Sequence, residues 1–172
     1  MSIALNVVLY QAGWLACVLG AARGAPWLGL AAAVPIVAWH LLRAKRPAPE
    51  ALLLLAAAIF GAVFETQLVQ LDWVRYPLDS WPAGLAPAWM VALWTLFGTT
   101  LNVSMRFLRE RPWLAVLLGG IAAPAAYYAG ARAGALELAV PAAALAAIAA
   151  GWALCTPLLL QLGKRLDGYA QP

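Results

Sequence analysis

The chain has 172 residues, of which 65% are hydrophobic and only 10% are charged, and its formal net charge is +4. Soluble domains contain about 45–50% apolar and about 25% charged residues, so this composition could not cover the surface of a soluble protein of this size. It excludes a typical cytosolic enzyme, a disordered tail and a fibrous repeat. The solvent around most of the chain is therefore expected to be lipid.

Six apolar stretches follow one another, and each is about as long as a membrane-spanning helix, which needs about 20 residues to cross a hydrocarbon layer of about 30 Å. Because lipid offers no hydrogen bonds, each stretch must satisfy its own backbone as a helix. The sequence thus predicts an all-α fold, a polytopic bundle of six transmembrane helices forming a single integral-membrane domain over residues 1–172. The expected helices cover residues 3–21, 27–42, 51–71, 88–108, 112–130 and 135–162.

Lysine and arginine collect on one side of this six-span topology. The side that holds both termini and the second and fourth loops carries Arg43, Lys45, Arg46, Arg106, Arg109, Arg111, Lys164 and Arg165, whereas the other side carries Arg23, Arg75 and Arg132. Cytoplasmic loops are enriched in basic residues. Both termini are therefore predicted to be cytoplasmic, in a multi-pass protein of the bacterial inner membrane.

The basic stretches are short and lie at helix ends, where they can contact anionic lipid headgroups. They do not indicate nucleic-acid binding. Cys17 and Cys155 are expected near opposite membrane faces, and no metal-ligand spacing is present. Phosphate loops, catalytic serine elbows and dinucleotide fingerprints are also absent from the sequence. We expect no metal, no cofactor and no nucleic-acid partner.

The longest predicted loop, residues 72–87, contains three prolines together with Trp73, Tyr76 and Trp81. Indole and phenol rings settle at the membrane–water interface. This loop is therefore predicted to be an interfacial flap at the level of the headgroups.

Glu65 is the most informative polar residue, because an ionisable group inside a span costs about 2.5–3.5 kcal/mol on insertion scales. It lies in the outer half of the third predicted helix, near the same face as Gly61 and Asp72. Arg75 and Arg132 are its expected partners. Two interpretations stay open: a site for a substrate headgroup or a proton, or a hydrogen bond or ion pair that ties this helix to the loops.

A second candidate is a polar stripe on the fourth predicted helix, formed by Thr95, Thr99, Asn102 and Arg106 at spacings i, i+4, i+7 and i+11. Such stripes face other helices or a water-filled cavity. Asn102 and Arg106 could hold an anionic group near the cytoplasmic boundary. Alternatively, the threonines bond their own helix carbonyls and Arg106 extends to the membrane surface.

Asn6, Tyr10 and Trp14 follow one another at every fourth position of the first predicted helix, and Gln11 adds a further amide. These side chains either line a groove or lock the helix into the bundle. Trp94 lies deep in the fourth helix and needs a partner for its N–H. It either flanks a lipid or aromatic ligand or fills the core.

His40 is predicted to lie at the cytoplasmic end of the second helix. Without a carboxylate or cysteine partner apparent in the sequence, it is interpreted as a boundary residue rather than a metal ligand.

Four stretches, in this order, resemble a bacterial family of small polytopic inner-membrane proteins described only as a domain of unknown function. They are Tyr10-Gln11-x-x-Trp14 leading to Gly20-Ala21, Gly61-x-x-x-Glu65, Leu93-Trp94-x-x-Phe97-x-Thr99-Thr100-Leu101-Asn102-x-Ser104, and Gly119-x-x-x-x-Pro124-x-x-Tyr127-x-x-Gly130-Ala131-Arg132-x-Gly134-Ala135. The chain departs from the family pattern at Glu65, where members often have Asp, and at Val103, where they have His. The resemblance implies a six-helix inner-membrane protein encoded beside fatty-acyl-modifying and lipoprotein genes, and hence a role linked to lipids.

The first of three function classes is a protein that binds, moves or presents an acyl or isoprenoid lipid, without covalent chemistry of its own. Its expected partners are membrane lipids and a partner membrane protein or lipid-modifying enzyme. The candidate binding residues are Gln11, Glu65, Trp94, Asn102, Arg106, Tyr127 and Arg132.

The other two classes are a carrier and an enzyme. A small-solute carrier would resemble the substrate-binding subunits of energy-coupling-factor vitamin transporters, with Ala12 and Ala16 as its small-residue contact. An intramembrane enzyme would use Glu65 as acid or base, and such chemistry usually needs a second tuned group within hydrogen-bond reach. The candidates for that group are Tyr127, Tyr128 and Arg132.

Overall fold

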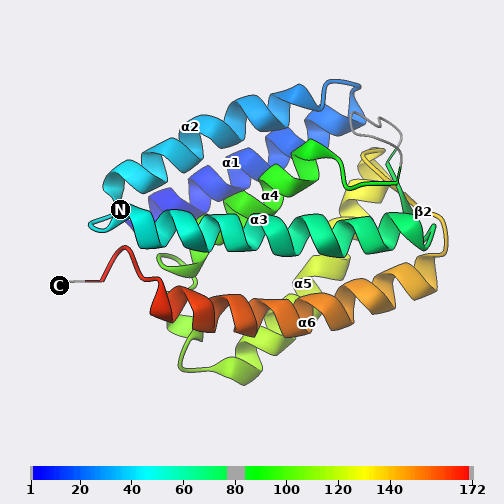
Figure 1. The fold of residues 1–172 in the computed structure, drawn as a ribbon. Coiled ribbons are helices and arrows are strands. Elements are labelled where there is room, and N and C mark those ends of the chain that lie inside the picture. Colours follow the sequence, from blue (N-terminus) through cyan, green and yellow to red (C-terminus); the bar gives the residue numbers. More distant parts are fainter. Residues whose placement is uncertain (1, 77–83, 171–172) are drawn as a thin grey trace.

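The structure is a computed structural model that describes residues 2–76 and 84–170, and these residues form six α-helices (Figure 1). The helices alternate in direction, so the two termini and the α2–α3 and α4–α5 connections lie at the same end of the bundle, at the left in Figure 1. We call this the terminal end. The helices are α1 (Ile3–Ala22), α2 (Trp27–Arg43), α3 (Pro47–Gln70), α4 (Ala88–Leu101), α5 (Pro112–Ala133) and α6 (Pro141–Arg165).

The opposite end, which we call the β end, holds two short strands, β1 (Val74–Arg75) and β2 (Glu137–Leu138). They pair antiparallel, with Val74 opposite Leu138 and Arg75 opposite Glu137. This pairing joins the chain after α3 to the chain before α6.

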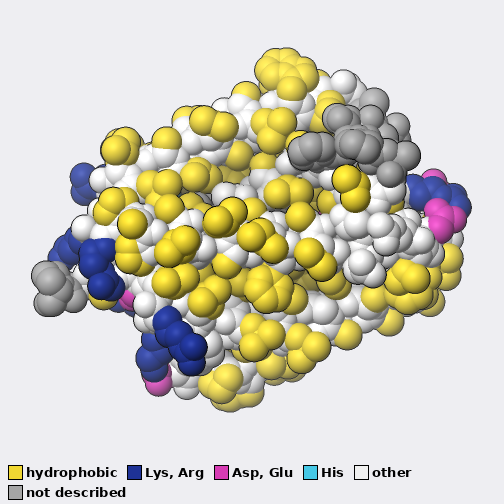
Figure 2. All heavy atoms as spheres, viewed as in Figure 1, with side chains coloured by type: hydrophobic (Ala, Val, Ile, Leu, Met, Phe, Trp, Pro, Cys, Tyr) yellow, Lys and Arg dark blue, Asp and Glu magenta, His cyan; other side chains and the backbone are white. Residues whose placement is uncertain are grey.

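The central helix of the bundle is α4. Each of its residues is buried or half-buried, and it packs against α1, α2 and α3, whereas α5 and α6 pack mainly against each other. On the face seen in Figure 2, apolar side chains cover the flank of the molecule, and the basic side chains lie at its two ends. An apolar flank between charged ends is the surface expected of a protein whose sides face lipid.

Four helices, α1, α3, α5 and α6, are long and apolar enough to cross a membrane. The other two, α2 and α4, are apolar but shorter, with 17 and 14 residues. The structure therefore confirms an all-α bundle with the character of a membrane protein. Helix α3 begins at Pro47 rather than at residue 51, because Pro47 occupies the first turn, where proline is favoured, and Glu50 complements the helix N-terminus.

The fourth helix was predicted to end at residue 108, but it ends at Leu101. Asn102 caps it, and the Val103 and Met105 N–H groups both bond to the Thr100 carbonyl, which turns the chain away from the helix axis. A short 3₁₀ helix, η1 (Arg106–Leu108), follows. Arg106 therefore does not continue the stripe of α4.

The sixth helix was predicted to begin at residue 135, but it begins at Pro141. The reason is the pairing of β2 with β1, which extends residues 137–138 and could not be read from local composition. Pro141 then opens the helix at its first turn, where the missing N–H of proline costs nothing.

The structure describes only part of the predicted interfacial flap. Trp81 and the rest of residues 77–83 lie outside the described residues. Tyr76, expected at the membrane surface, is instead buried, with 9% of its surface exposed.

Candidate functional site

Glu65 lies fully buried in α3 and accepts hydrogen bonds from three uncharged donors. The Tyr76 hydroxyl donates to Oε2 over 2.7 Å, Trp94 Nε1 donates to Oε1 over 2.9 Å, and the Tyr127 hydroxyl also donates to Oε1. A buried carboxyl group is costly unless it is hydrogen-bonded, and these donors cover both of its oxygens. Glu65 thereby connects α3 to the segment after β1, to α4 and to α5.

Tyr76 reaches this carboxyl group from outside the helices. Burial is the main cause that raises the pKa of Tyr76 well above its ordinary value, and the nearby Glu65 and Tyr127 raise this pKa further. Its hydroxyl therefore remains protonated at neutral pH and stays available as a donor.

The glycine at position 61 makes room for one of these bonds. A Cβ atom on Gly61 would overlap the ring of Trp94. With glycine there, the indole lies against α3 and its N–H reaches Glu65 one helical turn later. The Gly61-x-x-x-Glu65 pattern is thus explained by packing and hydrogen bonding together.

The two arginines expected to pair with Glu65 lie elsewhere. Arg75 pairs with Asp72, whose carboxylate lies 2.5 Å from Nη2, and with Glu137 at 3.3 Å across the β1–β2 pair. Arg132 is exposed near the end of α5. Within the described residues, the partners of Glu65 are uncharged.

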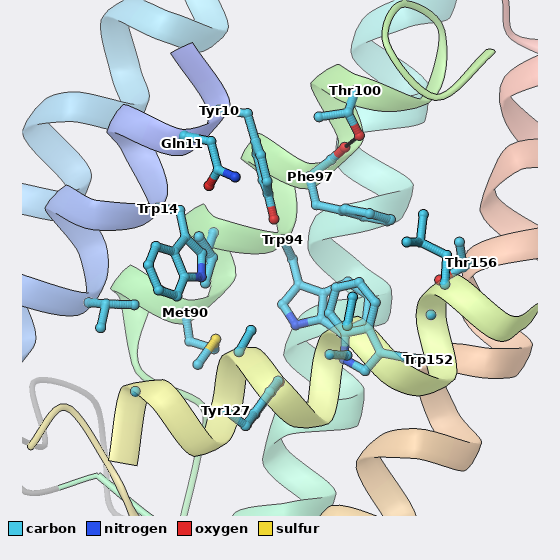
Figure 3. A pocket seen from close by; sticks show the side chains of 18 of the residues that line it. Tyr10, Gln11, Trp14, Met90, Trp94, Phe97, Thr100, Tyr127, Trp152 and Thr156 are labelled. Carbon is cyan, nitrogen blue, oxygen red and sulfur yellow. Dashed lines mark hydrogen bonds between the residues drawn. The ribbon is translucent and has the colours of Figure 1, made fainter. Parts of the chain in front are cut away.

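A cavity of about 590 Å³ lies on the other side of Trp94 and Tyr127, among α1, α4, α5 and α6 (Figure 3). One face of α1, from Val7 to Val18, forms one wall, and one face of α5, from Leu118 to Gly130, forms another. At 1.5 Å per helical residue, these walls are about 16 Å and about 18 Å long. The cavity is therefore a long slot that runs along the bundle.

The lining of the cavity is uncharged throughout and rich in aromatic rings. In Figure 3, Tyr10, Gln11 and Trp14 extend from α1 on one side, and Trp94 and Trp152 stand across from them. The rings of Trp94 and Trp152 stack with centroids 4.1 Å apart. Trp94 and Tyr127 both line the cavity and bond Glu65, so the carboxyl group lies directly behind its wall.

A second buried polar cluster lies at the terminal end, and we call it the terminal cluster. At its centre, Glu50 accepts Asn102 Nδ2 at 2.7 Å and the Gly168 N–H at 2.9 Å, and its Oε1 lies 2.8 Å from His40 Nε2. His40 therefore has the carboxylate partner that sequence reasoning did not find for it. The short connection between the two helices could have indicated this pair, because it brings the end of α2, with His40, beside the start of α3, with Glu50.

The second half of the terminal cluster is built around Asp167. Arg106 and Arg109 both donate to its carboxylate over 2.8 Å, and Arg109 also donates to Asn102 Oδ1. Tyr169 closes the cluster by donating to the His40 carbonyl at 2.6 Å. Burial and the nearby Glu50 raise the pKa of Tyr169 above its ordinary value.

The structure thus separates the predicted site residues into groups. Gln11, Trp94 and Tyr127 line the cavity, and Glu65 lies behind it. Asn102 and Arg106 belong to the terminal cluster, where Asn102 donates to Glu50 and Arg106 donates to Asp167, both acidic residues of the chain itself. Sequence reasoning missed Glu50 and Asp167, which lie outside the predicted helices at residues 51–71 and 135–162.

The threonines of the predicted α4 stripe bond their own helix. Thr95 donates to the Val91 carbonyl and Thr99 to that of Leu96. Thr100, which is not part of the stripe, likewise donates to the Phe97 carbonyl. On α1, Asn6 bonds the Thr99 carbonyl and the Ser104 N–H, which locks α1 to α4. Asn6 therefore locks α1 into the bundle, whereas Tyr10, Gln11 and Trp14 line the cavity.

The described part of the chain holds no group of three or more His, Cys, Asp or Glu side chains able to bind a metal.

No curated protein and no solved structure matches the chain. A family model matches residues 3–158, and this agrees with the resemblance found along nearly the whole sequence. The chain belongs to the family described as "Protein of unknown function (DUF2878)".

Proposed function

We propose that this protein binds the apolar chain of a membrane lipid in the slot between α1 and α5 and holds or presents it within the bilayer. The observation that carries the proposal is the cavity itself, about 590 Å³ in volume and lined by uncharged, mainly apolar and aromatic side chains. Ligand sites are concave, mostly apolar and about 300–1,000 Å³ in volume.

The position of the slot supports a ligand that enters from lipid. Helices α1 and α5 contact each other much less than α1 contacts α4 or α5 contacts α6. Both carry exposed apolar side chains on their outer faces, such as Val8 on α1 and Ile121 on α5. A chain leaving the hydrocarbon layer would therefore pass between two lipid-facing helices without crossing a polar surface.

The proposal includes six membrane crossings with both termini in the cytoplasm of a bacterial cell. Helices α2 and α4 would be about 25 Å and about 21 Å long, shorter than the hydrocarbon layer. Irregular backbone is tolerated at membrane depth where protein surrounds it. The turns after α4 meet this condition, since Asn102 and Val103 are buried.

The experiment is native mass spectrometry of protein extracted from membranes in mild detergent. We expect wild-type protein to carry bound lipid, and Ala126→Trp, which fills the slot from α5, to lose it. Ala125→Trp is the matched control, because Ala125 is the exposed neighbour outside the slot. Lipid-free wild-type protein, or equal occupancy in both variants, would contradict the proposal.

A second candidate function, intramembrane acid–base chemistry, is favoured by one contact. Tyr127 lines the cavity and donates to Glu65, so a proton has a path between a bound molecule and the carboxyl group. If the protein modifies its ligand, the bound lipid should change in mass over time with wild-type protein and not with Tyr127→Phe. An unchanged lipid mass in both would exclude this candidate. Among the described residues, no contact favours the carrier interpretation.

A further inference from the structure

The two ends of the slot differ in their exposure to the surroundings. At the β end, five lining residues each have at most 5% of their surface exposed: Val18, Trp89, Met90, Ala135 and Leu136. At the terminal end, Val7 and Leu118 are 42% and 44% exposed, and Ser104 and Met105 are half-buried. We call these four residues the mouth of the slot. An elongated ligand with one polar end can therefore keep that end solvated only at the mouth.

The interior of the slot is unsuited to a charged group. Its lining is uncharged among the residues that the structure describes. The carboxyl group of Glu65 lies directly behind Trp94 and Tyr127. Because a charge taken out of water without a partner is costly, any charge on the ligand must remain at the mouth.

Two exposed arginines border the mouth. Arg106 directly follows Met105 in the chain, and its side chain is 44% exposed. Arg111 is also exposed, and it precedes Leu118 by seven residues, or two helical turns, which places both on the same face of α5. The chain between the two arginines is tightly turned, since the Arg111 N–H bonds to the Leu108 carbonyl. Both cations therefore belong to the same end of the slot.

The positive charge of these arginines is only partly compensated. Arg106 and Arg109 share the single carboxylate of Asp167. Arg106 uses Nε and Nη2 for its bonds, and within the described residues Nη1 has no partner. Glu110, the acid beside Arg111 in the chain, is paired with a lysine, and Arg111 itself forms no ion pair in the described part of the chain. The mouth can therefore attract an anion.

We propose that the ligand is a lipid with an anionic headgroup, whose chain fills the slot and whose phosphate or carboxylate group lies at the mouth beside Arg106 and Arg111. This inference rests on the proposed function and adds the chemical class of the ligand and its direction in the slot. The basic side chains at the terminal end are visible in Figure 2. Anionic lipids of the cytoplasmic leaflet attract basic residues, and the terminal end is the end proposed to face the cytoplasm.

The experiment is a native mass-spectrometric titration of delipidated protein, in nonionic detergent, with four compounds of the same chain length. Hexadecyl phosphate and palmitate are anionic, 1-hexadecanol is neutral and hexadecyltrimethylammonium is cationic. We expect the anions to bind about five- to twenty-five-fold more tightly than 1-hexadecanol, because each arginine near a membrane surface contributes about fivefold. The cation should bind least. Whichever anion binds more tightly identifies the headgroup as a phosphate or a carboxylate.

The variants test the arginine that has no ion pair within the described residues. Arg111→Gln should weaken the binding of hexadecyl phosphate about fivefold and Arg111→Glu about twenty-five-fold, and both should leave that of 1-hexadecanol unchanged. Lys45→Gln is the matched control, because Lys45 is an exposed base at the same end, on the α2–α3 connection and outside the slot lining. It should bind both compounds as wild type does.

The outcomes are distinguishable. Equal affinity for hexadecyl phosphate and 1-hexadecanol would overturn this inference while the slot remains a binding site for chains. Tightest binding of the cation, or equal losses in Arg111→Gln and Lys45→Gln, would also overturn it. If none of the compounds binds wild-type protein more tightly than it binds Ala126→Trp, the proposed function itself fails.

Discussion

At the scale of single residues, Glu65 shows how an acid is kept inside a bundle whose sides face lipid. Its oxygens accept hydrogen bonds from Tyr76, Trp94 and Tyr127, and it has no charged partner among the described residues. Removing the acceptor would leave three buried donors, so the carboxyl group and its neighbours depend on each other. Glu65 is therefore a structural connection as well as the polar centre beside the slot.

The first prediction compares two substitutions at this position. Glu65→Leu should lower the free energy of unfolding by about 3 kcal/mol or more, because each buried donor left without a partner costs about 1–3 kcal/mol. Glu65→Gln keeps one carbonyl oxygen for the donors and should cost less. Unfolding in mixed detergent micelles measures both. A leucine variant as stable as wild type would show that these bonds contribute nothing.

At the scale of elements, the terminal cluster ties the end of α6 to α2, α3 and the turns after α4. Asp167 holds Arg106 and Arg109, and the Gly168 N–H reaches Glu50 at the start of α3. The short α4 and the chain after α6 therefore depend on each other. The contacts stabilise helix ends that would otherwise expose unpaired carbonyl groups.

The second prediction contrasts a buried ion pair with an exposed one. Asp167→Ala removes the partner of Arg109, whose side chain is 8% exposed, and should lower the free energy of unfolding by about 3 kcal/mol. Glu110→Ala removes an acid that is 78% exposed and pairs with Lys164. It should cost less than about 1 kcal/mol. Equal effects in the same denaturation assay would contradict the importance of the buried pair.

The third prediction concerns pH at the β end. The hydrogen bond from Arg75 lowers the pKa of Asp72 below its ordinary value. A lowered pKa in the folded state contributes stability at neutral pH that is lost as pH falls below about 4. Wild-type protein should thus be slightly more stable than Asp72→Asn at pH 7, and this difference should shrink progressively as the pH falls below about 4.

Thermal unfolding of both proteins across this range is the measurement. Asparagine is the suitable replacement because Asp72 has φ 55°, a left-handed conformation that asparagine tolerates well. The change therefore removes the charge with little backbone strain. A stability difference that does not change with pH would show that the charge of Asp72 is not its cause.

At the scale of the whole molecule, the basic residues divide unevenly between the two ends of the bundle. The terminal end holds eight of them, and the β end holds Arg23, Arg75 and Arg132. The apolar flank between these ends matches a bilayer (Figure 2). The proposal that the terminal end faces the cytoplasm rests on this uneven distribution of basic residues.

The fourth prediction tests that orientation by cysteine labelling. In a protein without Cys17 and Cys155, a cysteine at Arg132 should react with an impermeant maleimide on intact bacterial spheroplasts. A cysteine at Lys45 should react only after the membrane is opened. Both positions are exposed, at opposite ends of the bundle. Labelling of both before permeabilisation, or the reverse pattern, would contradict the orientation.

Much of the fold could be predicted from the sequence because apolar runs and their length are local properties. The starts of α1, α2, α4 and α5 coincide with the predicted ones. The end of α4 and the start of α6 could not be predicted, since each is set by partners distant in the chain. Asn102 of α4 meets Glu50, and β2 pairs with β1.

The candidate site likewise combines features that are local in the sequence with contacts between distant residues. The sequence by itself determined that Glu65 is exceptional, because an acid within an apolar run is costly wherever its partners lie. It also determined the helical count and the asymmetry of basic residues. Only the tertiary structure decided that the partners of Glu65 are Tyr76, Trp94 and Tyr127, and that α1 and α5 leave a slot between them. Helix packing brings these groups together, and packing depends on side chains far apart in the sequence.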